Sequence, residues 1–172
     1  MNHSLNTYQN ILELIGNTPL INLKKSVADY DGSFFAKFEA FNPGHSNKDR
    51  IAIHIIEEAE RKGILKPGNT VIETTSGNTG FSLAMVSMIK GYNCILAVSS
   101  KSSTDKINML SAMGAQVHVC PANVPTVDPR SYYEVAKRLH SEINDSVYIN
   151  QYFNSPNVNA HYNSNGSATW EQ

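Results

Sequence analysis

Short apolar runs alternate with helix-like patterns along most of the chain, and this alternation restricts the fold more than any other feature. Residues 48–63 predict an amphipathic helix, because Ile51, Ile55 and Ala59 fall on one face. The other predicted helices are 78–91, 103–114 and 129–143, and the predicted strands are 34–41, 69–74, 94–98, 116–120 and 146–150.

This order of elements predicts an α/β fold, in which a parallel sheet carries helices on both faces and the crossovers are right-handed. Ligands of open α/β sheets bind beyond the carboxyl ends of the strands. The candidate site loops are therefore the segments that follow the predicted strands, namely 42–48, 75–79, 99–103, 121–130 and 151–157.

Composition narrows the class of protein. The chain has 172 residues, of which 41% are hydrophobic and 17% charged, so it can form a core of one domain or slightly more. The net charge of -1, without a basic block, argues against a nucleic-acid or membrane-surface binder. No apolar run approaches the roughly 20 residues that span a bilayer. The polar residues 1–10 do not resemble a secretory signal, so we expect a cytoplasmic protein.

The metal-binding residue types show no pattern typical of a metal site. Cys94 and Cys120 both lie in apolar, strand-like segments, and we expect them to be buried free thiols in a reducing compartment. The six histidines have no ligand spacing. No metal is therefore expected.

The stretch "TTSGNTG", residues 74–80, follows a predicted strand and opens a predicted helix. Thr75, Ser76 and Thr79 supply hydroxyl groups, while Gly77 lets the backbone approach a ligand closely. The helix start adds unpaired N–H groups and a positive dipole, which favour a carboxylate or a phosphate. A plain capped helix start is the alternative for any single residue, but seven such residues together favour a site. The spacing matches neither the Walker A motif nor the G-x-G-x-x-G motif of nucleotide-binding loops.

The stretch "NPGHSNKDRIA", residues 42–52, places Lys48 at the start of a helix, where the helix dipole disfavours a cation. Because Lys48 also follows a predicted strand, we expect it at the same edge of the sheet as Ser76. This setting helps the neutral amine, which is the form that makes a Schiff base. A lone lysine of this kind is more often an exposed surface residue.

Several motifs in succession resemble the fold type II pyridoxal-phosphate enzymes of the cysteine synthase and cystathionine β-synthase group. Tryptophan synthase β shares this fold. The motifs are "LIGNTPLINL" (14–23), "KFEAFNPGHSNKDRIA" (37–52), "LKPGNTVIETTSGNTG" (65–80), "AMGAQV" (112–117) and "NQYFNSPNVNAHY" (150–162).

The resemblance implies pyridoxal 5'-phosphate as the cofactor and assigns two residues to its binding. Lys48 matches the lysine that forms the internal aldimine and later removes the Cα proton. Asn78 matches the asparagine that hydrogen-bonds the 3′ oxygen of the cofactor. The implied reaction is β-replacement on serine or an O-activated serine by a sulfide or thiol, with the cofactor as electron sink.

The resemblance also assigns a substrate site for a small-molecule amino acid. Thr75, Ser76 and Thr79 match residues that bind the substrate carboxylate, and Gly77 lies in the same loop. Gln151 matches a glutamine that assists them. A homodimer is expected from the family.

Some positions depart from the family pattern. Gly44 and His45 stand where two small residues, commonly Gly-Gly, are usual, and Asn47 stands where valine is common. All three lie beside Lys48, so we expect them either to alter how substrate fits or to mark a relaxed constraint at this site.

The resemblance covers the N-terminal half of the family's length, since family chains continue well past Gln172 and supply the phosphate-binding loop there. We expect residues 1–41 to begin a large domain, 42–147 to form a small mobile domain, and 148–172 to return into the large one. The 172 residues by themselves are expected to show little or no β-replacement activity.

Two other functions stay open. A truncated, non-catalytic paralogue would bind an amino acid or an acidic peptide terminus at the 75–79 loop, although it would have no need of Lys48. A different α/β enzyme would use the same loop for phosphate, which requires the resemblance to be accidental. The leaving group, which is hydroxyl, acetyl or phosphate, and the nucleophile are not specified by these residues.

Overall fold

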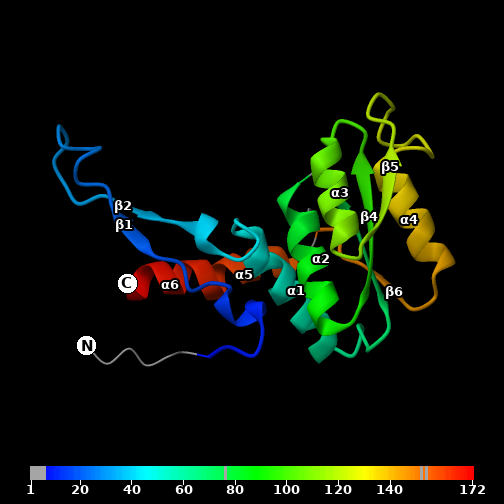
Figure 1. Ribbon diagram of the computed structural model, residues 1–172, viewed down its shortest axis with the longest axis horizontal. Coiled ribbons are helices and arrows are strands. Elements are labelled where there is room, and N and C mark those ends of the chain that lie inside the picture. Colours follow the sequence, from blue (N-terminus) through cyan, green and yellow to red (C-terminus); the bar gives the residue numbers. More distant parts are fainter. Residues whose placement is uncertain (1–6, 76, 152, 154) are drawn as a thin grey trace.

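The computed structural model describes residues 7–75, 77–151, 153 and 155–172 and has two parts, an α/β unit and an elongated arm (Figure 1). The α/β unit contains a four-stranded parallel sheet, as predicted, with strand order β5–β4–β3–β6. The strands are β3 (Thr70–Thr75), β4 (Asn93–Ser99), β5 (Gln116–Cys120) and β6 (Ser146–Tyr148).

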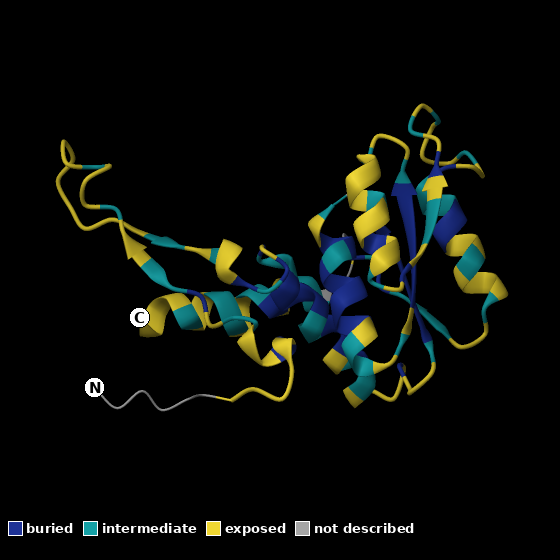
Figure 2. Cartoon of the chain, viewed as in Figure 1, coloured by how far each residue is buried: buried dark blue, intermediate teal, exposed yellow. Residues whose placement is uncertain are grey.

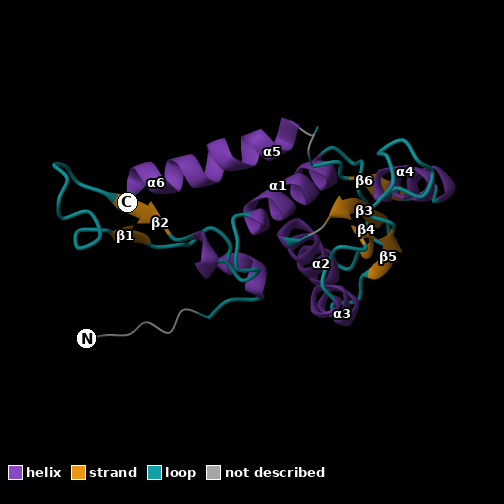
Figure 3. Ribbon diagram, turned by 90° about the horizontal axis from the view of Figure 1, so that it is seen from above, coloured by secondary structure: helices purple, strands orange, loops and turns teal. Residues whose placement is uncertain are grey.

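Helices cover both faces of this sheet, which confirms the predicted fold class (Figure 3). One face carries α2 and α3, the other carries α4, and α1 packs against the outer side of α2. The predicted helices form at their expected positions, because serines at 103 and 131 cap two of them and Gly91 ends a third at φ 77°. The bounds are α1 (Lys48–Arg61), α2 (Asn78–Lys90), α3 (Thr104–Ala112) and α4 (Tyr132–Glu142).

The core lies on both sides of β3, whose six residues are all buried. Val71 packs toward α1 and α2, whereas the next residue, Ile72, packs with Val135 and Ala136 of α4. This alternation is what a strand covered on both faces requires. Figure 2 shows the buried residues concentrated in the sheet and in α2, while the far end of the arm is largely exposed.

The predicted strand 34–41 is wrong in its extent and in its sheet. Only β2 (Phe35–Lys37) is extended, and it pairs antiparallel with β1 (Leu20–Asn22), outside the parallel sheet. A 3-10 helix, η2 (Glu39–Phe41), follows at once. The apolar run that suggested one strand is largely surface here, since Phe41 is 67% exposed. Lys48 therefore does not follow a strand of the parallel sheet.

The C-terminal end of the chain lies beside β1 and β2 in the arm (Figures 1 and 3). The Lys37 ammonium donates to the Gln172 side-chain oxygen at 2.6 Å, and the Gln172 amide donates to the Thr18 carbonyl at 3.2 Å. The remaining elements of the arm are η1 (Ile11–Leu14), α5 (Ser155–Ala160), the π-helix η3 (His161–Gly166) and α6 (Ser167–Glu171).

A buried ion pair joins the arm to α1. Arg50, 3% exposed, donates to the Glu39 carboxylate at 2.8 Å and to the Gly16 carbonyl at 2.8 Å. The Thr18 hydroxyl donates to the same carboxylate at 2.6 Å. Burial acts to raise the pKa of Glu39, but the hydrogen bonds from Arg50 and Thr18 hold it below its ordinary value. Two motifs that are far apart in the sequence, "IGNTPL" and "KDR", thus form one structural joint.

Two further features concern the predictions on thiols and membranes. Cys94 and Cys120 are both buried and free. Within the part of the chain that the structure describes, no helix is long and apolar enough to cross a membrane, and no group of His, Cys, Asp or Glu is arranged to hold a metal ion.

Candidate active site

The turn between β3 and α2 is built around Thr75. Its hydroxyl oxygen accepts hydrogen bonds from the N–H of Gly77 at 3.2 Å and of Gly80 at 3.1 Å. A Cβ on Gly80 would collide with the Thr75 methyl group, so the close approach of strand and helix requires glycine there. A Cβ on Gly77 would meet nothing within 4 Å, so this part of the turn is open. Ser76, a predicted site residue, lies outside the described residues.

Gln151 reaches this turn from the segment after β6, the strand that lies beside β3. The Thr79 hydroxyl donates to the Gln151 side-chain oxygen at 2.7 Å, and both residues are buried. The Gln151 N–H donates to Glu73 at 3.0 Å, and its carbonyl accepts from the Asn157 amide at 3.0 Å. With its side-chain oxygen used, the glutamine has only its NH₂ group left to offer, and that group has no acceptor among the described residues.

The backbone conformation of Asn150 directs Gln151 toward the β3–α2 turn. Asn150 adopts φ 48°, a left-handed conformation that asparagine tolerates better than most residues. Ile149 N–H still bonds Ile72 in the parallel ladder, but two residues later Gln151 N–H turns to the Glu73 side chain instead. The chain therefore leaves the sheet at β6 and passes over the β3–α2 turn.

Glu73 is a buried residue that holds Gln151 in place, and the sequence analysis missed it. It lies in the middle of the sheet with no exposed surface, and its carboxylate accepts from Thr74 N–H at 2.6 Å and from Gln151 N–H at 3.0 Å. Burial raises the pKa of Glu73 to about 7, although these hydrogen bonds act in the opposite direction. A charged residue within the buried run "VIETT" was the signal that could have identified it.

Lys48 is the first residue of α1 and is half-buried. Its backbone N–H donates to the Ser46 hydroxyl at 3.2 Å, which leaves the side chain to extend from the helix start. The Lys48 amine makes no hydrogen bond or ion pair with any residue in the described ranges. It is therefore an amine at a pocket wall that is free to react with a ligand.

The loop before Lys48 is fastened by Asp49. This buried carboxylate accepts from Gly44 N–H at 2.5 Å and from the Ser82 hydroxyl of α2 at 2.5 Å. Burial raises the pKa of Asp49, against the effect of both hydrogen bonds. A Cβ at position 44 would collide with this carboxylate, and His45 is left-handed at φ 59°. The preference for small residues at both positions thus has a steric origin, and His45 is accommodated with some strain.

Lys48, the β3–α2 turn and Gln151 line one pocket of about 400 Å³. It combines the Lys48 amine, the start of α2 with its positive dipole, and the NH₂ group of Gln151, and none of its lining residues is acidic. Such a lining suits an anion that also carries an amine-reactive group. The lining residues are Lys48, Thr75, Gly77, Asn78, Thr79, Gln151 and Asn157, of which only Asn157 was not predicted.

Residues 11–172 match the family model described as pyridoxal-phosphate dependent enzyme. The chain belongs to this family. A cystathionine beta-synthase from Apis mellifera is 44% identical over 164 residues, which are 94% of this chain and 32% of that protein. Cysteine synthase 1 from Emericella nidulans is 41% identical over 162 residues, which are 94% of this chain and 44% of that protein.

The fold agrees with this membership of the pyridoxal-phosphate dependent enzymes. The crystal structure of O-ureido-L-serine synthase superposes with a TM-score of 0.86 at 31% identity, over 95% of this chain and 50% of that one. The chain thus spans about a third to a half of the length of the relatives it matches. The expected fold type II architecture is confirmed over that span.

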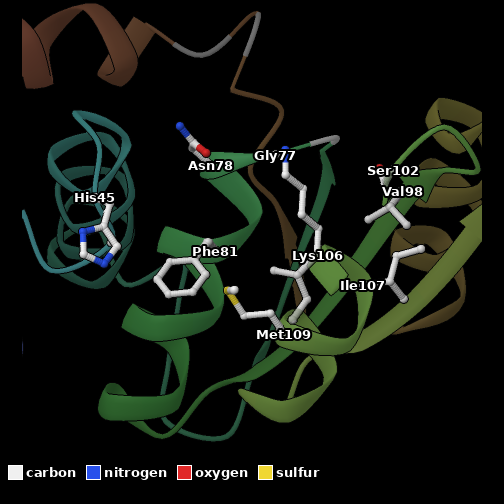
Figure 4. Close-up of a pocket in the computed structure, with 11 residues that line it drawn as sticks. His45, Gly77, Asn78, Phe81, Val98, Ser102, Lys106, Ile107 and Met109 are labelled. Carbon is white, nitrogen blue, oxygen red and sulfur yellow. The ribbon is translucent and has the colours of Figure 1, made fainter. Parts of the chain in front are cut away.

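The pocket fits one end of the family's cofactor. Pyridoxal phosphate carries an aldehyde, which reacts with an amine such as that of Lys48, and a ring oxygen, which an amide such as that of Asn78 can bind. In Figure 4 the Asn78 amide extends away from the start of α2. We assign none of the described residues to the cofactor phosphate.

Proposed function

We propose that this chain is the N-terminal portion of a pyridoxal-phosphate-dependent β-replacement enzyme of the cysteine synthase and cystathionine β-synthase type. Its substrate is serine or an O-activated serine, and its nucleophile is a sulfide or a thiol. One observation carries the proposal: the amine of Lys48, which has no partner among the residues that the structure describes, shares a pocket with the polar groups of Thr75, Thr79 and Gln151.

The residues divide the work between binding and proton transfer. The N–H groups at the start of α2, beside the open turn at Gly77, donate to the substrate carboxylate, joined by the hydroxyl of Ser76 and the NH₂ group of Gln151. Lys48 holds the cofactor and, once released, takes the proton from Cα at its amine. When bound, the cofactor supplies the electron sink. Asn78 orients it through its ring oxygen.

The domain organisation is part of the same proposal. Residues 42–147 form the small mobile domain, while 1–41 and 148–172 belong to the large one. The separation of arm and α/β unit in Figure 1 supports this division. So do the bulky apolar side chains that the arm exposes, since Phe41 is 67% and Trp170 is 91% exposed and both need cover in the intact protein. We expect that protein to be a cytoplasmic homodimer.

The test is product formation by the intact natural protein loaded with pyridoxal phosphate. O-acetylserine, phosphoserine and serine are each supplied with sulfide or a thiol, and the thioether or cysteine product is measured. Lys48→Ala should abolish turnover, whereas Lys66→Ala, an exposed lysine in a turn, should not change it. Binding of an amino acid without any product, equal in wild type and Lys48→Ala, would favour the non-catalytic paralogue instead.

A further inference from the structure

A second pocket adjoins the Gly77–Asn78 turn. It is a recess of about 200 Å³ between α2 and α3, and it shares Gly77 and Asn78 with the candidate active-site pocket (Figure 4). Its remaining walls come mainly from Phe81, Val98, Ile107, Met109 and Leu110. The proposed substrate site and this recess are therefore separated by a single turn of backbone.

The walls of the recess are apolar. Val98 and Leu110 are nearly fully buried at its base, and the ring of Phe81 and the Met109 side chain face one another across it (Figure 4). Engineered apolar cavities of about 150 Å³ bind benzene. A recess of this size and lining therefore suits a phenyl ring or a branched aliphatic group, and inorganic sulfide would leave it empty.

Two polar groups stand at the mouth of the recess. The Ser102 hydroxyl is buried and has no hydrogen-bond partner within the described part of the chain, which is costly for a polar group unless a ligand satisfies it. Lys106 extends from α3 toward Gly77, and its ammonium forms no ion pair with any residue that the structure describes (Figure 4). A cation at the mouth favours the thiolate over the thiol of an entering ligand.

We propose that this recess is the nucleophile subsite and that it takes a thiol with a compact apolar group, aromatic or branched aliphatic, in preference to inorganic sulfide. This inference rests on the proposed β-replacement function. A serine held by its carboxylate at the Gly77 turn lies beside Gly77 and Asn78, which also line the recess, so a thiol in the recess would approach the substrate from this turn. The apolar group of the thiol fills the recess, and its sulfur lies at the mouth beside Lys106.

The test compares two serine-to-leucine substitutions, one in the loop before α3 and one within α3. Ser102→Leu fills the recess from its mouth and removes the unpartnered hydroxyl. Ser111→Leu adds the same side chain at an exposed position of α3 that does not line the recess. The kcat/KM for phenylmethanethiol, divided by that for sulfide, is measured on the intact, cofactor-loaded protein. We expect a preference for the thiol in wild type, a loss of at least about tenfold in Ser102→Leu, and no change in Ser111→Leu.

A binding measurement separates this inference from the proposed function. Benzyl alcohol, an unreactive probe, is titrated into methyl-labelled protein, and the signals of Val98, Ile107 and Leu110 are followed. Shifts in wild type that vanish in Ser102→Leu support the recess as a ligand site, even if no β-replacement product is found. Unmoved signals, or a thiol-to-sulfide ratio that Ser102→Leu leaves unchanged, would overturn it.

Discussion

The hydroxyl of Thr79 donates a hydrogen bond of 2.7 Å to the side-chain oxygen of Gln151, a residue 72 positions away in the sequence. Both partners are buried. The bond fixes the orientation of the glutamine amide, so its NH₂ group faces the pocket that Lys48 also lines. One buried contact thus connects the turn that opens α2 to the segment that leaves the sheet after β6.

Removing the Thr79 hydroxyl should therefore weaken amino-acid binding as well as the fold. Thr79→Val keeps the shape of the side chain but leaves the Gln151 oxygen buried without a donor, which costs about 1–3 kcal/mol. We expect a lower free energy of unfolding by about that amount, measured in urea, and a KM for serine raised at least about tenfold. Thr79→Ser keeps the donor and should retain most of the affinity. Equal KM values for the two variants would contradict this role.

Because Asp49 fastens the loop before Lys48, a side chain at position 44 should not be tolerated. Gly44→Ala places a methyl group against the Asp49 carboxylate, and no flexible side-chain end can yield there because Asp49 is held by Ser82. We expect a loss of stability of about 2–3 kcal/mol and displacement of Lys48. Gly166→Ala is the matched control, since its added Cβ makes only an ordinary contact in a helix and should be neutral or slightly stabilising.

Glu73 should make the stability of the protein depend on pH. Burial raises its pKa from 4.5 to about 7, so the folded state binds this proton more tightly than the unfolded state. The stabilisation is fully present below pH 4.5 and is lost as pH rises through about 7, by on the order of 3 kcal/mol.

Urea unfolding of wild type and Glu73→Gln between pH 4.5 and 8 checks this prediction. The unfolding free energy of wild type minus that of Glu73→Gln should fall by on the order of 3 kcal/mol toward higher pH, because only wild type contains the titrating group. A difference that stays constant across the range would show that the pKa of Glu73 is not raised.

The joint between the arm and α1 depends on a buried charge. Arg50→Gln leaves the Glu39 carboxylate and the Gly16 carbonyl without their main donor, and breaking such a pair costs on the order of 3 kcal/mol. Arg61→Gln removes an exposed arginine that pairs with Glu58 and should have little measurable effect. Thermal unfolding of both variants side by side would refute the distinction if their midpoints shifted equally.

Much of the fold could be predicted because local signals and burial agree in the α/β unit. Gly91 and Ser103 mark helix ends that form as expected, whereas Ser131 caps a helix that begins three residues later than predicted. The segment 34–41 failed because an apolar run indicates a buried strand only when a core covers it, and here the arm exposes Phe35 and Phe41. Sequence periodicity does not report which surface another part of the protein will cover.

The candidate site was predictable in its residue types and less so in its connections. Lys48 and Thr75 reach one pocket although the reason given from the sequence, a common sheet edge, was wrong, because η2 and a turn precede Lys48. The contacts that hold the site together are long-range. Glu73 meets Gln151 only because Asn150 diverts the chain at a positive φ, and no local pattern encodes that turn.

The most direct measurement is the site of covalent attachment of pyridoxal phosphate. The intact natural protein is incubated with the cofactor, reduced with borohydride, digested and mapped by mass spectrometry. We expect the reduced pyridoxyl group on Lys48 alone, with loss of the adduct and of its visible absorbance in Lys48→Ala. Modification spread over exposed lysines such as Lys66 and Lys101, or an adduct that persists in Lys48→Ala, would contradict Lys48 as the cofactor-binding residue.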